Sequence, residues 1–343
     1  MRRLQAALAG WFIAALFLSA CVSATPDCAS ENVFCVGLVT NIGKVNDKSF
    51  NQSAWEGVYQ SQRELGAQVQ YIETVDPKDY DKNIAAFADE NYDVIVTVGF
   101  SMSEATLKAA GLHPNVKFIG VDQFQEEEIP NVVGLIFPED QAGFLAGALA
   151  ARMSKTQQIG AVCGPDVIPP VWRFGEGYRA GAAYADSLSG AATKVLIAYH
   201  ENNDIAFTDV EWGAETAKSM MDQGVDVIFG CGGVTGNSAI TTAAEAGAYV
   251  IGVDTDQYLT LPEAAPRMLS SAMKLITPGV LNLIRLAREG NFPGGSNHLG
   301  EAGYAPYHDL ESEVPADVKE IMEEIKAGLL DGSLETGVPA TKP

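Results

Sequence analysis

Short apolar segments rich in β-branched residues alternate with longer amphipathic segments along most of the chain. The apolar segments predict strands over residues 34–39, 68–73, 94–98, 117–121, 132–136, 158–163, 194–199, 225–230, 249–253 and 268–273. The amphipathic segments predict helices over residues 52–65, 80–89, 103–110, 141–153, 175–187, 211–223, 237–246, 278–288 and 316–329. Strands that alternate with helices of this length are typical of parallel sheets covered on both faces. The two successive series predict an α/β protein with two doubly wound parallel-sheet lobes.

One sequence element occurs once in each series. Residues 117–123 read Lys-Phe-Ile-Gly-Val-Asp-Gln, and residues 249–257 read Tyr-Val-Ile-Gly-Val-Asp-Thr-Asp-Gln. Each places an aspartate, Asp122 or Asp254, at the carboxyl end of a predicted strand. Ligands bind at that edge of open α/β sheets. Two lobes that present such edges to each other predict a binding cleft between them.

The N-terminus has the pattern of an export signal. Two arginines precede a nearly uncharged apolar run that extends to residue 20, which predicts a signal peptide over residues 1–20. A membrane-spanning helix is the alternative, because the run is just long enough to cross a bilayer. Leu18-Ser19-Ala20-Cys21 resembles the bacterial lipobox, which favours lipidation of Cys21 and a tether over residues 21–32. We therefore expect an extracytoplasmic protein, anchored by lipid to the membrane of the cell envelope.

Composition excludes several classes of protein. The chain has 343 residues, of which 47% are hydrophobic and 19% charged, so it can bury a core and is not intrinsically disordered. The formal net charge of −22 argues against nucleic acid as a partner, because such binding requires basic patches that displace counterions.

The cysteines and histidines give no sign of a metal site. In an exported protein Cys28 and Cys35, seven positions apart, could pair, and the sequence leaves this open. Cys163 and Cys231 each end an apolar run and are expected to be small buried hydrophobes. The four histidines are scattered and the chain has no Cys-x-x-Cys, so we expect no metal and no cofactor.

A polar loop after the first strand carries the first candidate binding residues. Asp47 and Ser49 could simply cap the following helix. Phe50 and Asn51 in the same loop suit a planar polar ligand, because the ring stacks on the ligand while polar groups fix its edge.

Two further sets of candidate binding residues lie at the ends of predicted strands. The glycine-rich segment 230–236 has the spacing G-x-G-x-x-x-G, which differs from the dinucleotide fingerprint, so we interpret it as a ligand-facing turn. Asp122 and Asp254 can accept hydrogen bonds from hydroxyl or N–H groups, and Lys274 can donate to hydroxyl or carbonyl oxygens. Together they suit a ligand that carries hydroxyl groups and a base.

Several motifs resemble those of the basic membrane lipoprotein family. They are Asp47-Lys48-Ser49-Phe50-Asn51-Gln52, Gly120-Val121-Asp122-Gln123, Phe174-x-x-Gly177-Tyr178, Gly252-Val253-Asp254-Thr255-Asp256-Gln257 and Ser271-Ala272-Met273-Lys274. Members of that family serve ABC transporters and have the type I periplasmic-binding-protein fold, and its best understood members are purine nucleoside receptors. The resemblance implies that fold, an ABC permease as partner and a purine nucleoside as ligand.

The resemblance also implies a role for each candidate residue. Phe50 and Phe207 would sandwich the purine, and Asp122 and Asn51 would contact its edge. Asp254 and Lys274 would hold the ribose hydroxyls. The remaining candidates lie nearby, with glycine allowing a close approach of the backbone: Asp47, Ser49, Phe174 and Gly233.

The expected organisation is two lobes joined by a three-crossing hinge. Residues 33–137 and 254–292 are expected in lobe 1, and residues 138–253 and 293–343 in lobe 2. Closure of a monomer around the ligand would present the closed form to the permease. The alternatives are a receptor for riboflavin or a sugar, and an envelope enzyme. We expect no catalytic residues, because the chain lacks the Gly-x-Ser-x-Gly elbow of esterases and any histidine near a candidate nucleophile.

Overall fold

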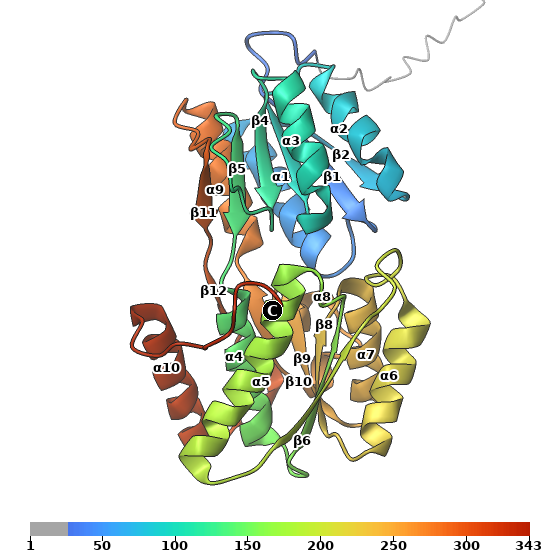
Figure 1. The fold of residues 1–343 in the computed structure, drawn as a ribbon, viewed down its shortest axis with the longest axis vertical. Coiled ribbons are helices and arrows are strands. Elements are labelled where there is room, and N and C mark those ends of the chain that lie inside the picture. Colours follow the sequence, from blue (N-terminus) through green and yellow to red (C-terminus); the bar gives the residue numbers. More distant parts are fainter. Residues whose placement is uncertain (1–26) are drawn as a thin grey trace, which may run out of the picture.

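The protein consists of two α/β lobes stacked end to end, as the computed structural model of residues 27–343 shows (Figure 1). The expected signal peptide and the lipidation residue Cys21 lie outside the described residues. The sheet of lobe 1 has the order β11-β5-β4-β3-β1-β2. Its strands are β1 (Cys35–Ile42), β2 (Gln68–Thr74), β3 (Val94–Val98), β4 (Lys117–Val121), β5 (Val132–Ile136) and β11 (Ser296–Leu299).

Helices cover both faces of the lobe 1 sheet. Helices α1 (Phe50–Leu65) and α9 (Ile276–Arg288) pack together on one face, where their apolar side chains join a buried cluster with β1, β3, β4 and β5. Helices α2 (Tyr80–Ala88) and α3 (Ser103–Leu112) bury their apolar sides on the other face. The buried strands are apolar on both faces, as expected of a sheet between two helical layers.

Lobe 2 repeats this plan. Its sheet has the order β12-β10-β9-β8-β6-β7. Its strands are β6 (Gln158–Cys163), β7 (Lys194–Tyr199), β8 (Val227–Cys231), β9 (Tyr249–Asp254), β10 (Met268–Lys274) and β12 (Ala302–Tyr304). Helices α4 (Glu139–Met153), α5 (Pro169–Ser189) and α10 (Ala316–Asp331) cover one face, and α6 (Val210–Asp222) and α7 (Gly233–Glu245) cover the other. The short α8 (Gln257–Thr260) follows β9.

Nearly all neighbouring strands are parallel. The exception among the described strands is β12, which pairs antiparallel with β10. The strands of lobe 1 therefore share one direction, and in Figure 1 their carboxyl ends point toward lobe 2. The predicted fold class, two doubly wound lobes of the type I periplasmic-binding-protein kind, is confirmed.

Two of the three expected chain crossings lie elsewhere in the structure. The first crossing runs through Phe137 and Pro138, between β5 of lobe 1 and α4 of lobe 2. The second was expected near Asp254, but β10 stays in lobe 2 as the neighbour of β9, so the chain crosses at Leu275. The third was expected near Phe292, but β11 pairs with β5 in lobe 1, so the chain crosses back at Gly300 and Glu301. The boundaries drawn from sequence failed because an apolar strand pattern does not reveal its neighbour.

Four cysteines form two disulfides. Cys28 is bonded to Cys35, which fastens the segment before β1 to the start of that strand. Cys163 and Cys231 are buried, as expected, but they are also bonded to each other, which the sequence analysis did not predict. Their strands β6 and β8 are neighbours that pair these two residues in register, although 68 positions separate them in the chain.

Candidate functional site

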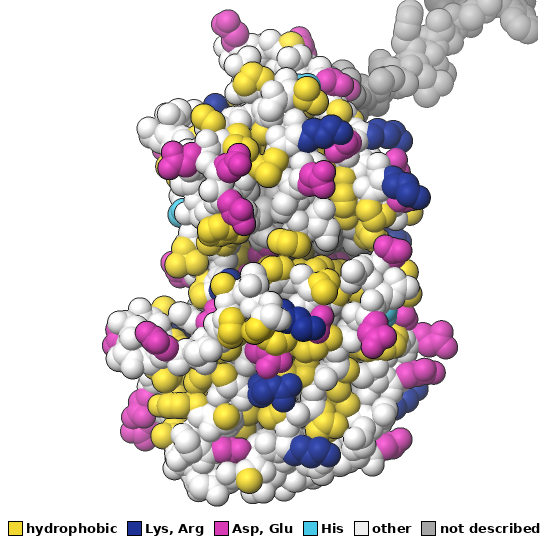
Figure 2. Space-filling model, viewed as in Figure 1, with side chains coloured by type: hydrophobic (Ala, Val, Ile, Leu, Met, Phe, Trp, Pro, Cys, Tyr) yellow, Lys and Arg dark blue, Asp and Glu magenta, His cyan; other side chains and the backbone are white. Residues whose placement is uncertain are grey.

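A cavity, partly open to solvent, lies between the two lobes at the carboxyl ends of their strands. Figure 2 shows hydrophobic side chains gathered where the lobes meet. The cavity wall contains nine of the ten candidate residues, drawn from segments far apart in the chain: Asp47, Phe50, Asn51, Asp122, Phe174, Phe207, Gly233, Asp254 and Lys274. A cavity in this position, lined by aromatic and polar side chains from both lobes, is typical of a small-molecule site.

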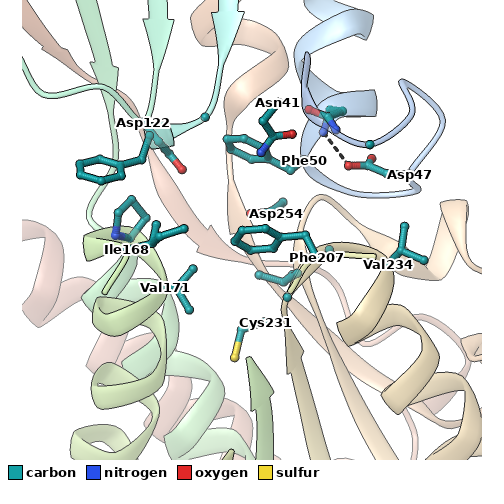
Figure 3. Close-up of a pocket in the computed structure, with 18 of the residues that line it drawn as sticks. Asn41, Asp47, Phe50, Asp122, Ile168, Val171, Phe207, Cys231, Val234 and Asp254 are labelled. Carbon is teal, nitrogen blue, oxygen red and sulfur yellow. Dashed lines mark hydrogen bonds between the residues drawn. The ribbon is translucent and has the colours of Figure 1, made fainter. Parts of the chain in front are cut away.

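Two aromatic rings enter the cavity from opposite lobes. Phe50 is the first residue of α1 in lobe 1, and Phe207 lies in the loop between β7 and α6 of lobe 2 (Figure 3). The main-chain oxygen of Phe207 accepts a hydrogen bond from the Val234 N–H, at 2.9 Å, which fixes this loop to the start of α7. Gly233 has a φ of +56°, and a β-carbon there would lie 3.2 Å from the same oxygen. Gly233 therefore allows the loop that carries Phe207 to pack closely.

Asp47 fixes the loop that leads into α1. Its carboxylate accepts hydrogen bonds from the main-chain N–H groups of Ser49, Asn51 and Gln52, at 2.9–3.1 Å. Such bonds satisfy donors at the start of a helix. Burial raises the pKa of Asp47 to about 7, although these N–H groups oppose the shift. Asp47 thus caps the helix and also borders the cavity.

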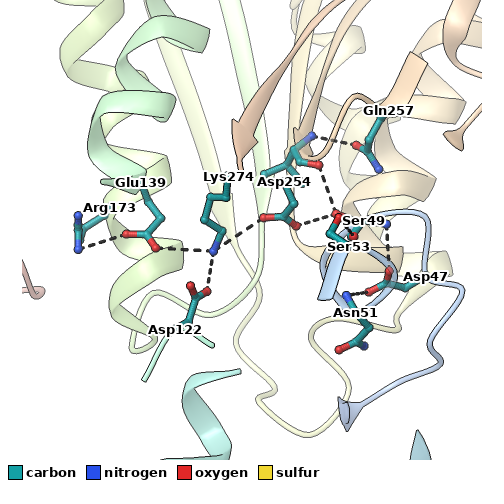
Figure 4. A network of polar contacts seen from close by, with 11 residues as sticks. Asp47, Ser49, Asn51, Ser53, Asp122, Glu139, Arg173, Asp254, Gln257 and Lys274 are labelled. Atoms are coloured by element: carbon teal, nitrogen blue, oxygen red, sulfur yellow. Dashed lines mark hydrogen bonds and ion pairs between the residues drawn. The ribbon is translucent and has the colours of Figure 1, made fainter. Parts of the chain in front are cut away.

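Ser49 is the candidate that the structure does not place in the cavity wall. Its side chain is fully buried, and its hydroxyl donates a 2.6 Å hydrogen bond to Asp254 Oδ2 (Figure 4). Ser49 therefore lies outside the described cavity wall in this conformation, and its contact with a ligand stays a prediction. Its hydroxyl instead holds the Asp254 carboxylate, which belongs to the other lobe.

Lys274, the last residue of β10, lies at the centre of a buried ionic cluster. Its Nζ is 2.6 Å from Asp122 of lobe 1, 3.6 Å from Glu139 and 3.8 Å from Asp254 (Figure 4). The same nitrogen lies 4.8 Å from the centre of the Phe50 ring. Burial alone would lower the pKa of Lys274, but the carboxylates of Asp122, Glu139 and Asp254 outweigh burial and raise it. The ammonium group therefore stays charged and bridges the two lobes.

Two members of this cluster, Glu139 and Arg173, were not predicted from the sequence. Glu139 begins α4 directly after the first crossing, and Arg173 of α5 lies 3.2 Å from it. Arg173 also donates to Asp140 and to the main-chain oxygen of Phe137, both at 2.9 Å, so it fastens the crossing to lobe 2. Burial raises the pKa of the Glu139 carboxyl, and this effect outweighs the opposing charges of Lys274 and Arg173.

Two buried acceptors at the cavity have no donor among the described residues. They are Asp122 Oδ1 and Asn51 Oδ1. A buried acceptor without a partner costs free energy, so the cavity favours a molecule that brings N–H or O–H donors to both places.

Other parts of the wall come from segments that the sequence analysis did not select. Asn41 lies at the carboxyl end of β1 and Gly99 follows β3, while Ile168 and Val171 lie at the start of α5. Asn41 and Gly99 could have been found in the same way as Asp122 and Asp254, because ligands bind at the carboxyl ends of strands in such sheets. The apolar pair had no such signal, because Ile and Val are common in any core.

Residues 27–343 contain neither a metal-type cluster nor a membrane-spanning helix. No cluster of three or more His, Cys, Asp or Glu in this range could hold a metal ion. None of the helices described there is long and apolar enough to span a membrane.

Comparison with known proteins places the chain in a family. The profile of the Bmp family, described as ABC transporter substrate-binding protein PnrA-like, matches residues 34–301. The ABC transporter nucleoside-binding protein BmpA of Lactococcus lactis is 30% identical over 87% of each chain. An uncharacterised lipoprotein of Pyrococcus abyssi is 31% identical over 80% of this chain and 69% of its own length. The crystal structure of a solute-binding protein of an ABC transporter system from Aeropyrum pernix has a TM-score of 0.79, with 26% identity over 88% of this chain and 92% of that one.

Two lobes that enclose a cavity at their facing strand ends are the arrangement expected of a solute-binding protein. The chain belongs to the Bmp family of ABC transporter substrate-binding proteins. The family resemblance drawn from the sequence motifs is thereby confirmed. The family is one of substrate-binding proteins, not of enzymes.

Proposed function

We propose that this protein captures a purine nucleoside between its lobes and delivers it to an ABC permease. The observation that carries the proposal is the pair of aromatic rings, Phe50 and Phe207, which enter the cavity from opposite lobes beside a carboxylate-rich end. Stacking on both faces suits a planar base, and base–aromatic stacking is worth about 1–3 kcal/mol per base. The name of the Lactococcus relative, a nucleoside-binding protein, supports the same ligand class.

The charges of the cavity favour a neutral ligand. Lys274 is the one cationic residue among the described residues of the wall, and its Nζ already faces three carboxylates. The only further ionisable side chain in the described part of this wall is the carboxyl group of Asp47, which supplies no positive charge. A phosphate group would have no free counter-charge, and burying it there would be costly. We therefore propose that nucleosides bind and nucleotides do not.

The polar residues divide between the two parts of the ligand. Asp122 Oδ1 and Asn51 Oδ1 are acceptors that lack a donor among the described residues, so they suit the N–H groups of a base or a hydroxyl. Asp254 and Lys274 suit the ribose hydroxyls. Phe174 packs behind this end, with its ring centre 5.4 Å from Lys274 Nζ.

Calorimetric titration tests the ligand. The protein is unfolded, washed free of bound molecules, refolded, and titrated with adenosine, guanosine, inosine, adenosine monophosphate, riboflavin and ribose. We expect heat from at least one nucleoside and affinity at least about 100-fold weaker for the monophosphate. Heat from riboflavin alone would indicate a riboflavin receptor, and heat from ribose alone would indicate a sugar receptor. A folded protein that gives no heat with any nucleoside would refute the nucleoside assignment.

We also propose that the mature protein is a monomer anchored outside the cytoplasm by lipid on Cys21. The lipobox-like sequence before Cys21 supports this, as does the lipoprotein name of the Pyrococcus relative. The Cys21→Ser variant should lose its lipid and leave the membrane fraction. Mass spectrometry of the processed N-terminus measures this, and a wild-type chain that retains residues 1–20 would contradict the proposal.

A further inference from the structure

A loop of lobe 1 rests on lobe 2 beside the ligand cavity. This loop, residues 43–49, connects β1 to α1, and two of its main-chain oxygens accept hydrogen bonds from lobe 2. Asn237 Nδ2 donates to the oxygen of Asp47 at 2.7 Å. Gln257 Nε2 and Thr260 Oγ1 donate to the oxygen of Lys48 at 3.1 and 2.8 Å.

Lobe 2 fixes these donors in place by itself. Asn237 Oδ1 accepts a 2.7 Å hydrogen bond from Gln257 Nε2, which joins α7 to α8. Gln257 Oε1 accepts from the Val253 N–H at 2.9 Å, and the Gln257 N–H donates to Ser271 Oγ at 3.0 Å. The side chain of Gln257 is fully buried and that of Asn237 nearly so. The donors therefore form a preorganised surface for the loop.

None of these donors belongs to the described wall of the ligand cavity. The loop moves with lobe 1 and the donors move with lobe 2, so opening the cleft must break all three hydrogen bonds. The loop also carries Asp47, whose carboxylate caps α1 and so positions Phe50. Docking of the loop on lobe 2 thus places Phe50 against the ligand cavity.

We propose that Asn237, Gln257 and Thr260 form a closing latch, which sets ligand affinity by stabilising the closed state without contacting the ligand. A ligand that binds the closed state has an apparent affinity that scales with the population of that state. This proposal rests on the proposed function only in the test that uses a nucleoside as the probe. The three are positioning residues.

A matched pair of threonine variants tests the latch by affinity. Thr260 Oγ1 donates to Lys48 O across the lobes, whereas Thr277 Oγ1 donates to Ser53 O within lobe 1, at 2.7 Å. Both side chains are partly buried. Thr260→Val should weaken binding of guanosine, adenosine or inosine by about 2- to 10-fold, the effect of losing one hydrogen bond of the closed state. Thr277→Val should leave affinity unchanged. Equal affinities of the two variants would overturn the latch.

A ligand-free measurement separates the latch from the nucleoside assignment. Asn237→Asp replaces the donor that faces Asp47 O by an acceptor, so the lobes should repel there. Small-angle X-ray scattering of the full chain without ligand should show a larger radius of gyration for Asn237→Asp than for wild type. An unchanged radius overturns the latch even if nucleosides bind. An increased radius supports it even if every nucleoside fails to bind, which would refute only the ligand assignment.

Discussion

The ends of β4 and β9 carry the same structural element, one in each lobe. Each reads Gly-Val-Asp, and the aspartates Asp122 and Asp254 both have a positive φ, +58° and +65°. Such backbone angles are uncommon outside glycine and occur often at functional sites. Gln123 directly follows Asp122, and Gln257 lies three positions after Asp254; each glutamine folds back against its own strand.

The two glutamines differ in what they hold. Gln123 Nε2 donates to the main-chain oxygens of Thr97 and Gly99, so it braces neighbouring strand ends of its own lobe. Gln257 Nε2 donates to Asn237 and, across the cleft, to Lys48 O. The same element therefore stabilises a wall of the cavity in lobe 1 and joins the two lobes in lobe 2. A repeated fold can thus acquire asymmetric roles through one side chain.

Lys274 is the point at which the two elements meet, and its replacement should have the largest effect. Lys274→Met leaves Asp122 and Asp254 buried without their cation and Glu139 paired with Arg173 alone, so we expect a loss of about 3–5 kcal/mol in the free energy of unfolding. Urea denaturation measures it. Lys319→Met removes a partly exposed lysine that pairs with Glu311 and should cost less than about 1 kcal/mol. Similar losses in both variants would show that the two elements are not coupled through Lys274.

The glycines of the two elements provide a sharper contrast. A β-carbon at Gly120 would lie 2.5 Å from Gln123 Oε1, and one at Gly252 would lie 2.7 Å from Gln257 Oε1. Each alanine variant should therefore lower the free energy of unfolding by about 1–3 kcal/mol. Only Gly252→Ala displaces a glutamine that spans the lobes, so it alone should enlarge the ligand-free radius of gyration. A larger radius in Gly120→Ala as well would remove the distinction between the elements.

Glu139 also faces Lys274 but belongs to neither Gly-Val-Asp element. It should affect how the free energy of unfolding depends on pH. Because burial raises its pKa above the usual value, the folded state binds a proton that the unfolded state releases. Its contribution to stability is complete below about pH 4.5 and is lost as pH rises toward neutrality, by at most about 1.4 kcal/mol per pH unit. Glu139→Gln should flatten the stability profile across this window. Glu324→Gln, at an exposed position, serves as control. The same slope of unfolding free energy against pH in wild type and in both variants would contradict this role of Glu139.

The sequence predicted most elements of the fold because each depends on a local pattern. Strand β4 was expected over residues 117–121 and is found as Lys117–Val121. Neighbour relations were harder to predict. The placement of β10 in lobe 2, the pairing of β11 with β5 and the Cys163–Cys231 disulfide all depend on contacts between distant segments.

Part of the candidate site could also be predicted, where a local pattern marks the residue. Asp122 and Asp254 were recognisable because each ends an apolar strand. Glu139 was not, since a glutamate at the start of a helix is also common at an exposed surface. The hydrogen bond of Ser49 to Asp254 could not be predicted either, because it joins two lobes whose segments lie far apart in the chain.

Hydrogen–deuterium exchange, measured by mass spectrometry with and without saturating guanosine, tests the central claim that both lobes hold one nucleoside. The expected result is slower exchange in residues 43–51 of lobe 1 and residues 231–235 of lobe 2, at the same guanosine concentration. These segments contain Phe50 and the turn that supports Phe207. Protection confined to one lobe, or absent from both, would contradict capture of a nucleoside between them.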